Sequence, residues 1–328
     1  MSDPYLAELT ARGLLPPAQA AAIAEADRAR PFSVHYELRA LLYLGIVLLS
    51  GGLGVLIYQH VDGIGHGALL TAVALLMGAC FYFASLHRPA FTWGVAPKTS
   101  VGADYLLLLG CLLFVALETY AQYQYGVFGT RYGLATALPA GLFIFLAYRY
   151  DHRGVLGLGL TALASWAGLA AQPLAVFSSN NYFSPAVRTA AIGLGLALTV
   201  AGLHAEARGR KAHFAFSYLL LGVNLAQLAL CATMLETSGF GAWGAALLVL
   251  AVSAGLYWYA RRVQSYWFLL LGAGYGYFAV GWMYVHLIDS DYGLIGGMLS
   301  ALAPFFLVIS ATGIVLLIFN LKTILRRP

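Results

Sequence analysis

The sequence predicts an all-α membrane protein: a polytopic helix bundle with about ten transmembrane helices, both termini cytoplasmic, and a short N-terminal helical pair. Of its 328 residues, 61% are hydrophobic and only 9% are charged, whereas soluble domains are roughly half apolar and about a quarter charged. Nearly all of the charged residues lie in the termini and in the segments between long apolar runs. This composition excludes disordered, collagen-like, disulfide-scaffold and nucleic-acid-binding proteins.

The chain begins with a polar segment that precedes the first apolar run. Its residues predict a short helix closed near Gly13 and an Ala-rich second helix that starts at Pro16 and stops before Pro31. Two such helices are too small to hold a hydrophobic core of their own. We therefore predict a cytoplasmic N-terminal helical segment at residues 1–38, lying on the membrane, on the bundle or on a protein partner, and a transmembrane bundle at residues 39–328.

Ten apolar runs follow as candidate membrane spans, of which residues 132–148 and 189–204 are the shortest. They are residues 40–58, 67–86, 103–121, 132–148, 154–175, 189–204, 213–234, 242–260, 265–285 and 294–320. The runs are continuous rather than alternating, which indicates helices and not strands. Of the 31 charged residues, 29 lie outside the runs, and only Asp104 and Glu118 lie inside them. This distribution is expected because charge is costly at membrane depth.

The cations predict the sidedness of the bundle, because Lys and Arg accumulate in cytoplasmic loops. With ten spans, 16 of the 18 cations fall on the side of the termini, and only Arg131 and Arg188 fall on the other. We therefore expect a multi-pass protein of the bacterial inner membrane, with no cleaved signal peptide. A basic inner face attracts anionic headgroups, so the expected partners are membrane lipids and not nucleic acid.

Glu118 is the first candidate site residue. It lies near the outer end of the third run, and an intramembrane carboxylate is a functional candidate by default. Arg131 follows across a short outer connection, so the two side chains are placed to form an ion pair. Such a pair would hold the two helices of the hairpin together, whereas an unpaired Glu118 in an apolar setting could carry a proton. The tyrosines that follow Glu118 are typical of the membrane–water interface.

Asn224 and Gln227 are the second candidates. They lie three residues apart in the seventh run and therefore share one helix face. Polar side chains in this position either form hydrogen bonds between helices or contact a substrate.

No sequence signature indicates a metal, a cofactor or a catalytic centre. The His and Asp residues of the outer loops match no closed metal-site spacing, and the three cysteines lie within apolar runs and form no CxxC motif. The sequence contains no GxSxG, HExxH or phosphate-binding GxxxxGK[ST]. We therefore predict no cofactor, no metal and no catalytic residues, which disfavours an enzyme.

A Leu-Gly step recurs early in every odd-numbered run. The glycines are Gly45, Gly110, Gly159, Gly222 and Gly272. This recurrence is typical of tandem helical hairpins in one orientation, although a chain with 37 glycines also produces chance matches. Glycine at such positions lets two helix backbones approach closely.

Four features of the sequence resemble a known family. They are the polar N-terminal segment, the glycine-rich first run ending in Tyr58-Gln59, the third run ending in Tyr and Gln, and Leu138-Pro139 before a polar exit at Arg149. On these features, clearest over the first 170 residues, the chain resembles family 2157 of the domain-of-unknown-function series. These are uncharacterised bacterial membrane proteins. The resemblance implies a polytopic inner-membrane protein and brings no activity with it.

Two functions are compatible with these observations. The first is a transporter or permease for a small solute or lipid, with Glu118, Arg131, Asn224 and Gln227 as candidates for substrate binding or proton coupling. The second is a non-catalytic membrane scaffold or sensor, with a protein partner at residues 1–38. The two hypotheses differ in whether the four polar residues converge on one cavity or are buried between packed helices.

Overall fold

The computed structural model describes residues 10, 12–13, 15–21, 35–97, 100–129, 133–171, 184–289 and 294–326. Within them the regular structure is helical and no strand occurs, so the all-α prediction is confirmed. The chain divides into two compact units, Met1–Ile64 and Gly65–Pro328.

The first unit contains helix α3 (His35–Ile64), which includes the first predicted span. Ahead of it, Gly13 has a φ of 69° and its N–H donates to the Thr10 carbonyl, at the point where the first N-terminal helix was predicted to close. Residues 17–21 are helical, and the Ala20 N–H donates to the Pro16 carbonyl. The remainder of both predicted N-terminal helices lies outside the described residues, and the boundary at residue 38 stays a prediction.

The second unit is a succession of helices, one for each of the other nine predicted runs. They are α4 (His66–Leu86), α5 (Val101–Tyr125), α6 (Leu134–Tyr150), α7 (Arg153–Ala171), α9 (Pro185–Arg208), the 3₁₀ turn η1 (Ala212–Phe214) with α10 (Ala215–Glu236), α11 (Phe240–Val263), α12 (Tyr266–Asp289) and α13 (Leu294–Arg326). Ser100 and Ser184 cap the N-termini of α5 and α9 by accepting hydrogen bonds from Ala103 N and Val187 N.

Seven helices in the described residues are long and apolar enough to cross a membrane, which supports a multi-pass membrane protein. These are α4, α5, α7, α9, η1 with α10, α11, and α12. The other three predicted spans contain shorter apolar stretches in the described residues, at Ala40–Gly52, Leu134–Tyr150 and Ser300–Ser310. The finer prediction of ten spans therefore stays a prediction.

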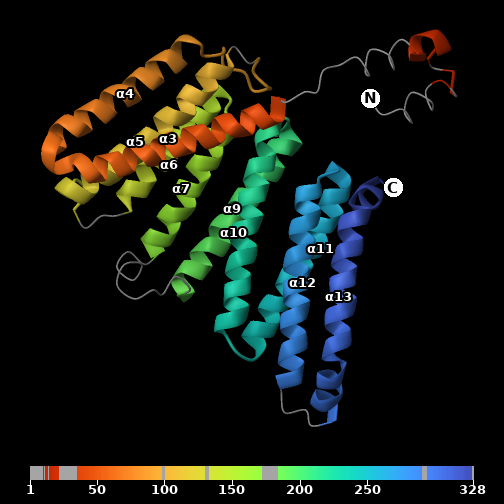
Figure 1. The fold of residues 1–328 in the computed structure, drawn as a ribbon. Coiled ribbons are helices and arrows are strands. Elements are labelled where there is room, and N and C mark those ends of the chain that lie inside the picture. Colours follow the sequence, from red (N-terminus) through yellow and green to blue (C-terminus); the bar gives the residue numbers. More distant parts are fainter. Residues whose placement is uncertain are drawn as a thin grey trace. The chain divides into compact units, whose positions relative to one another are not determined.

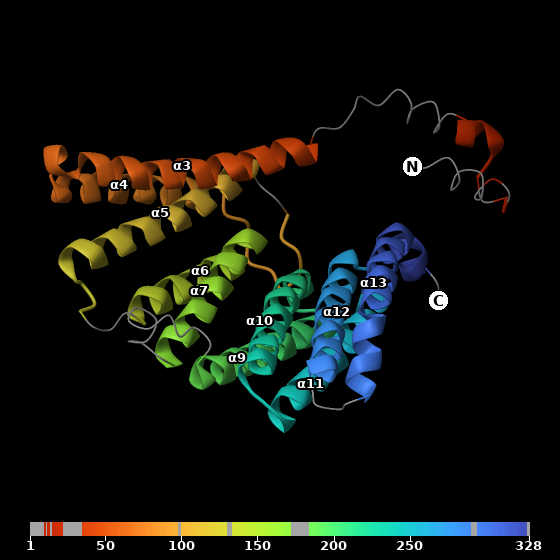
Figure 2. The same ribbon diagram turned by 60° about the horizontal axis from the view of Figure 1, so that its bottom comes forward.

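Neighbouring helices of the second unit pack as hairpins: α4 with α5, α6 with α7, α9 with α10, and α11 with α12 (Figure 1). Helix α10 also contacts α7, α11 and α12 (Figure 2). It contributes more buried residues than any other described helix. The core therefore lies around α10. Its side chains pack against apolar residues of α11 and α12 in two clusters, one around Phe268 and one around Met234.

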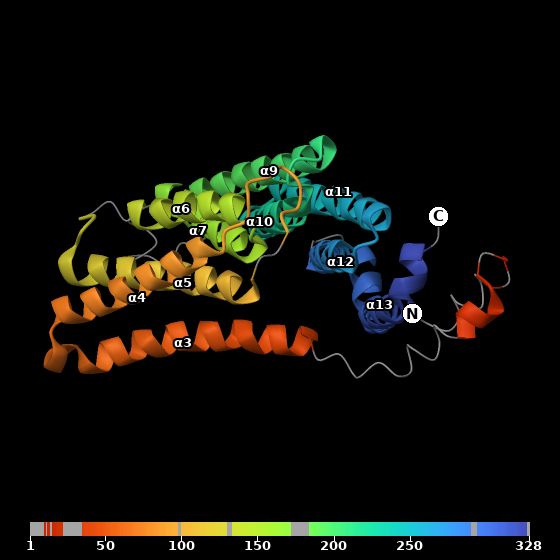
Figure 3. The ribbon, with the colours of Figure 1, turned by 90° about the horizontal axis from the view of Figure 1, so that it is seen from above.

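The chain reverses between the two helices of each hairpin in four connections that we call the basic turns: residues 87–100, 151–152, 209–214 and 264–265. Together with the helix ends beside them, they coincide with the cation-rich segments that were predicted to be cytoplasmic. The cations on these helix ends are Arg149, Arg153, Arg208, Arg261 and Arg262. Seen from above, the long connection after α4 extends to the turn between α9 and α10 (Figure 3), and the Lys211 N–H donates to the Trp93 carbonyl over 2.6 Å. Segments more than a hundred residues apart in the sequence therefore meet at this end of the unit.

Candidate functional site

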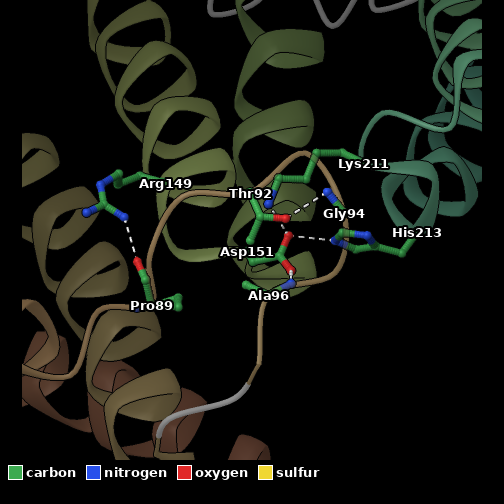
Figure 4. Close-up of polar contacts among 8 residues, drawn as sticks. All are labelled: Pro89, Thr92, Gly94, Ala96, Arg149, Asp151, Lys211 and His213. Carbon is green, nitrogen blue, oxygen red and sulfur yellow. Dashed lines mark hydrogen bonds and ion pairs between the residues drawn. The ribbon is translucent and has the colours of Figure 1, made fainter.

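Asp151 is the residue around which the basic turns meet. It follows the last residue of α6 and ends that helix in the left-handed conformation, with a φ of 58°. His152 completes the two-residue turn, and its Nδ1 accepts the Val155 N–H over 3.1 Å, which caps α7. The turn directs the Asp151 side chain away from its own hairpin toward two other connections (Figure 4).

Lys211 and His213 approach Asp151 from the turn between α9 and α10. Lys211 also has a left-handed backbone, with a φ of 50°. Its Nζ donates to Asp151 Oδ1 over 2.6 Å, and His213 Nε2 donates to the same oxygen over 2.7 Å. The three side chains are only 2%, 6% and 7% exposed for Lys211, Asp151 and His213. This is a buried ion pair with an imidazole attached, and not a solvated charge pair.

The connection between α4 and α5 supplies the third side of the cluster. The Ala96 N–H donates to Asp151 Oδ2 over 2.7 Å, so both carboxylate oxygens are hydrogen-bonded. Nearby, Arg149 Nη1 donates to the Pro89 carbonyl over 2.9 Å (Figure 4). We call Ala96, Asp151, Lys211 and His213 the turn cluster. It joins three successive hairpins at one end.

The electrostatics of the turn cluster favour the ionised carboxylate. Burial alone would raise the pKa of Asp151, but the hydrogen bonds from Lys211 and Ala96, together with the nearby charges of His213 and Lys211, hold that pKa below its ordinary value. The Lys211 ammonium also lies 5.5 Å from the Phe91 ring centroid and 5.7 Å from that of Phe214. Its charge is thus met by one carboxylate and two aromatic faces.

His213 leaves one polar atom of the turn cluster without a partner. An ionised carboxylate can only accept, so Nε2 carries the hydrogen toward Asp151. Nδ1 is buried and has no hydrogen-bond partner among the described residues. No group of three or more His, Cys, Asp or Glu residues in the described part of the chain is arranged to hold a metal ion. The contacts of the cluster hold three turns together.

The turn cluster was not predicted. Asp151 lies between Arg149 and Arg153 in the sequence, and its partners Lys211 and His213 lie about sixty residues further along the chain. The signal that could have indicated it is an acidic residue set among cations in a short connection. No sequence pattern specifies which distant cation that carboxylate contacts.

Asn224 and Gln227 are used in helix packing. The Tyr275 hydroxyl of α12 donates to Asn224 Oδ1 over 2.9 Å, and Asn224 Nδ2 donates to the Leu220 carbonyl. Gln227 is fully buried, and its Nε2 donates to Ser253 Oγ and the Val249 carbonyl of α11 over 3.2 and 3.4 Å. Gln227 Oε1 is buried without a partner in the described residues. Both side chains therefore attach α10 to the α11–α12 hairpin.

Glu118 lies on α5, in a different hairpin. Its Oε1 is buried and has no hydrogen-bond partner in the part of the chain that the structure describes. Arg131 lies outside the described residues, so the predicted ion pair with Glu118 stays a prediction. Two residues after Glu118, the Tyr120 hydroxyl shares a hydrogen bond of 2.6 Å with Nδ1 of His66, at the start of α4. That contact joins the far ends of α4 and α5.

The predicted candidates do not form one group among the described residues. The hydrogen bonds of Asn224 and Gln227 go to α11 and α12 or to α10 itself, whereas α5, which carries Glu118, packs on α4, α6 and α7. An apolar groove of about 500 Å³ lies beside Asn224, between α10 and α12, and the ring of Tyr275 is part of its wall.

Fold and polar groups together define a multi-pass helical membrane protein in which the turn cluster and Gln227 tie turns and helices to one another. Residues 7–156 match the model of the family described as "Predicted membrane protein (DUF2157)", which confirms the resemblance seen in the sequence. The matched segment includes Glu118 and Asp151 and ends before Lys211. No curated protein and no solved structure matches the chain.

Proposed function

We propose that the protein is a transporter for a small apolar or amphipathic molecule, with Glu118 as a proton-carrying group. The proposal includes ten membrane spans with both termini and the basic turns on the cytoplasmic side. The observation that carries it is the buried, unpartnered Oε1 of Glu118 among the described residues of an apolar helix.

An unpartnered carboxylate oxygen inside a spanning helix has an energetic cost. Burial of a polar group without a hydrogen bond costs about 1–3 kcal/mol in proteins, and burial of an unpaired charge costs more. A helix with no use for Glu118 would be more stable with an apolar residue there. A carboxyl group that gains and loses a proton during a transport cycle offers a reason for its presence.

The groove between α10 and α12 supports the proposed substrate class. Its volume of about 500 Å³ is within the range of small-molecule sites. Its lining is almost wholly apolar, with Leu228, Leu235, Leu271 and Phe278 among the contributing residues and the Tyr275 side chain as the one that bears a hydroxyl. Such a lining favours an apolar or amphipathic molecule over an ion or a sugar. Helix α7 contacts both α5 and α10 and would connect Glu118 to this groove.

The proposal is tested by translocation of a fluorescent short-chain phospholipid in vesicles reconstituted with the full chain, with and without a pH gradient. We expect Glu118→Gln to lose the pH-dependent part of the flux, by about tenfold or more, because the amide cannot exchange a proton. Glu236→Gln is the matched control, since Glu236 is exposed at the end of α10. Unchanged pH-dependent flux in Glu118→Gln would remove the proton-carrying role.

A scaffold or sensor is the second candidate, and a specific observation favours it. Asn224 and Gln227 are both used in contacts within and between helices, and the turn cluster joins three hairpins, as expected for a protein built to hold one arrangement. In this proposal residues 1–38 would hold a protein partner at the cytoplasmic surface. Absence of flux from both wild-type and Glu236→Gln vesicles that contain folded protein would favour this candidate.

A further inference from the structure

A second groove lies between α11, α12 and α13, separate from the one beside Asn224. Its volume is about 440 Å³. It is lined by Ser253 and Tyr257 of α11, Gly272, Gly276 and Tyr277 of α12, and Phe306 of α13, among others. The three helices that form it are consecutive in the chain and contact one another.

Small residues of α12 line this groove and let α12 approach α11 closely. At Gly272 the two helices of the hairpin nearly touch, because a Cβ there would lie 2.9 Å from the Ser253 carbonyl oxygen. Helix α13 is held against α12 by the stacked rings of Tyr284 and Phe306, whose centroids are 4.2 Å apart, and by the contact of 3.3 Å between the hydroxyls of Tyr277 and Ser310. Helix α13 therefore forms one side of the groove.

A cation stands at the end of the groove that faces the basic turns. Helix α11 ends with Arg261 and Arg262 in its last turn. The Arg261 guanidinium lies 5.9 Å from the ring centroid of Tyr257, and Tyr257 is a groove wall. Arg262 is at the same distance from the ring of Trp258, which is 64% exposed and is not part of this wall. Of these two adjacent arginines, Arg261 therefore lies beside the groove and Arg262 lies beside a different surface.

We propose that this groove binds an anionic phospholipid from the leaflet on the side of the basic turns. One acyl chain lies along the apolar wall of α11 and α12, and the headgroup phosphate lies at Arg261. Burying methylene groups in a groove stabilises the chain, and a guanidinium is a bidentate partner for phosphate. The combination of an apolar groove in a spanning segment with a cation at its end matches a lipid that has both parts. The site is independent of transport.

The binding test uses the purified full chain in detergent and native mass spectrometry with phosphatidylglycerol and phosphatidylcholine of identical acyl chains. We expect wild type to retain phosphatidylglycerol preferentially. Arg261→Gln should lose about fivefold of that preference, the contribution of one basic residue near an anionic headgroup. Arg262→Gln removes the same charge from the same helix end and should lose less than about twofold. Arg261→Lys should restore part of the preference.

A groove-filling variant tests the acyl-chain part separately. Ala273→Phe places a ring into the groove and should reduce retention of both lipids, whereas the arginine variants affect only the anionic one. Equal losses in Arg261→Gln and Arg262→Gln would overturn the site in favour of general attraction to the basic face. Competition by inorganic phosphate, or loss of a dimer in Ala273→Phe, would overturn it in favour of a free anion or a second copy of the chain.

Discussion

At the residue scale, three non-glycine residues in left-handed backbone conformations mark the turns of three successive hairpins. Asp151, Lys211 and Gln264 have φ values of 58°, 50° and 57°. Such a conformation costs an L-residue roughly 1–2 kcal/mol, and it persists where the surroundings stabilise it. For Asp151 and Lys211 the stabilising contact is the ion pair of the turn cluster, in which the ammonium and the carboxylate lie 2.6 Å apart.

The turn cluster predicts a pH-dependent contribution of Asp151 to stability. Asp151→Asn should lower the free energy of unfolding by on the order of 3 kcal/mol at neutral pH, because it leaves Lys211 buried without its carboxylate. The folded-state pKa of Asp151 is lowered, so the stability gained from ionisation is complete above the unfolded-state pKa and is lost as the pH falls through the folded-state pKa. Denaturation of purified wild type and Asp151→Asn from neutral pH to below about pH 4 should show their difference shrink only in the acidic range.

A double variant separates the ion pair from the shape of the turn. Asp151→Asn with Lys211→Met removes both charges, so that no ammonium is left buried without its carboxylate. We expect the double variant to be more stable than Asp151→Asn alone. A double variant less stable than either single one would show that the turn cluster contributes through something other than the charge pair.

At the element scale, the two helices of each hairpin come closest together at glycines of the recurrent Leu-Gly steps. Gly110 faces the Phe81 ring of α4, and Gly159 faces the backbone of α6 at Ile144. Gly222 and Gly272 meet the backbones of α9 and α11, where an added Cβ would lie 2.8 and 2.9 Å from the nearest atom. In all four hairpins, the second helix presents such a glycine to the first. The expected close approach of helix backbones is therefore observed at Gly159, Gly222 and Gly272, whereas Gly110 makes room for an aromatic ring.

The closest pair, α9 with α10, is the place to test this packing. An added Cβ at Gly195 would lie 2.7 Å from backbone atoms of Ala226 and Gly222, so neither helix can accommodate it without moving apart. Gly195→Ala should destabilise the protein by about 1–3 kcal/mol. Gly193→Ala, two residues earlier on α9, is the control, because no described atom lies within 4 Å of its added Cβ. Equal unfolding transitions for the two variants would contradict the packing argument.

At the scale of the whole molecule, the hairpin turns and most of the cations of the second unit lie at the same end of its helices. All four connections within hairpins are basic turns, and neighbouring helices are antiparallel, so these turns lie on one side of the second unit (Figure 1). Three of them meet in the turn cluster. Lys211, one of the cations on which the predicted orientation depends, is thus also the charged partner of Asp151 in the finished fold.

The orientation is tested with single cysteines in a variant that lacks Cys80, Cys111 and Cys231. Gln264→Cys, in the last basic turn, should react with a membrane-impermeant thiol reagent only after the cytoplasmic side is exposed. Ser238→Cys, in the connection between α10 and α11, should react from the outside, because that connection lies at the other end of the helices. Labelling of both positions from the same side would contradict the ten-span topology.

Much of the architecture was predictable from the sequence because it depends on local composition. Long apolar runs must be helical in hydrocarbon, since every backbone polar group needs a partner within the segment. Helices were accordingly found at all ten predicted runs, and Gly13 closed a turn where expected. Seven helices in the described residues have the length and apolarity required of a span. The other three predicted spans contain only shorter apolar stretches there.

The polar sites were only partly predictable. Glu118, Asn224 and Gln227 could be singled out because a polar group in an apolar run is rare and costly. Their partners could not, since Tyr275 and Ser253 are one helix or more away from Asn224 and Gln227. The sequence by itself determined the class of protein, the positions of its helices and the segregation of its charges, all of which follow from solvation in a bilayer. Tertiary structure decided that Asp151 meets Lys211, His213 and Ala96, because such contacts depend on how hairpins pack and not on any local periodicity.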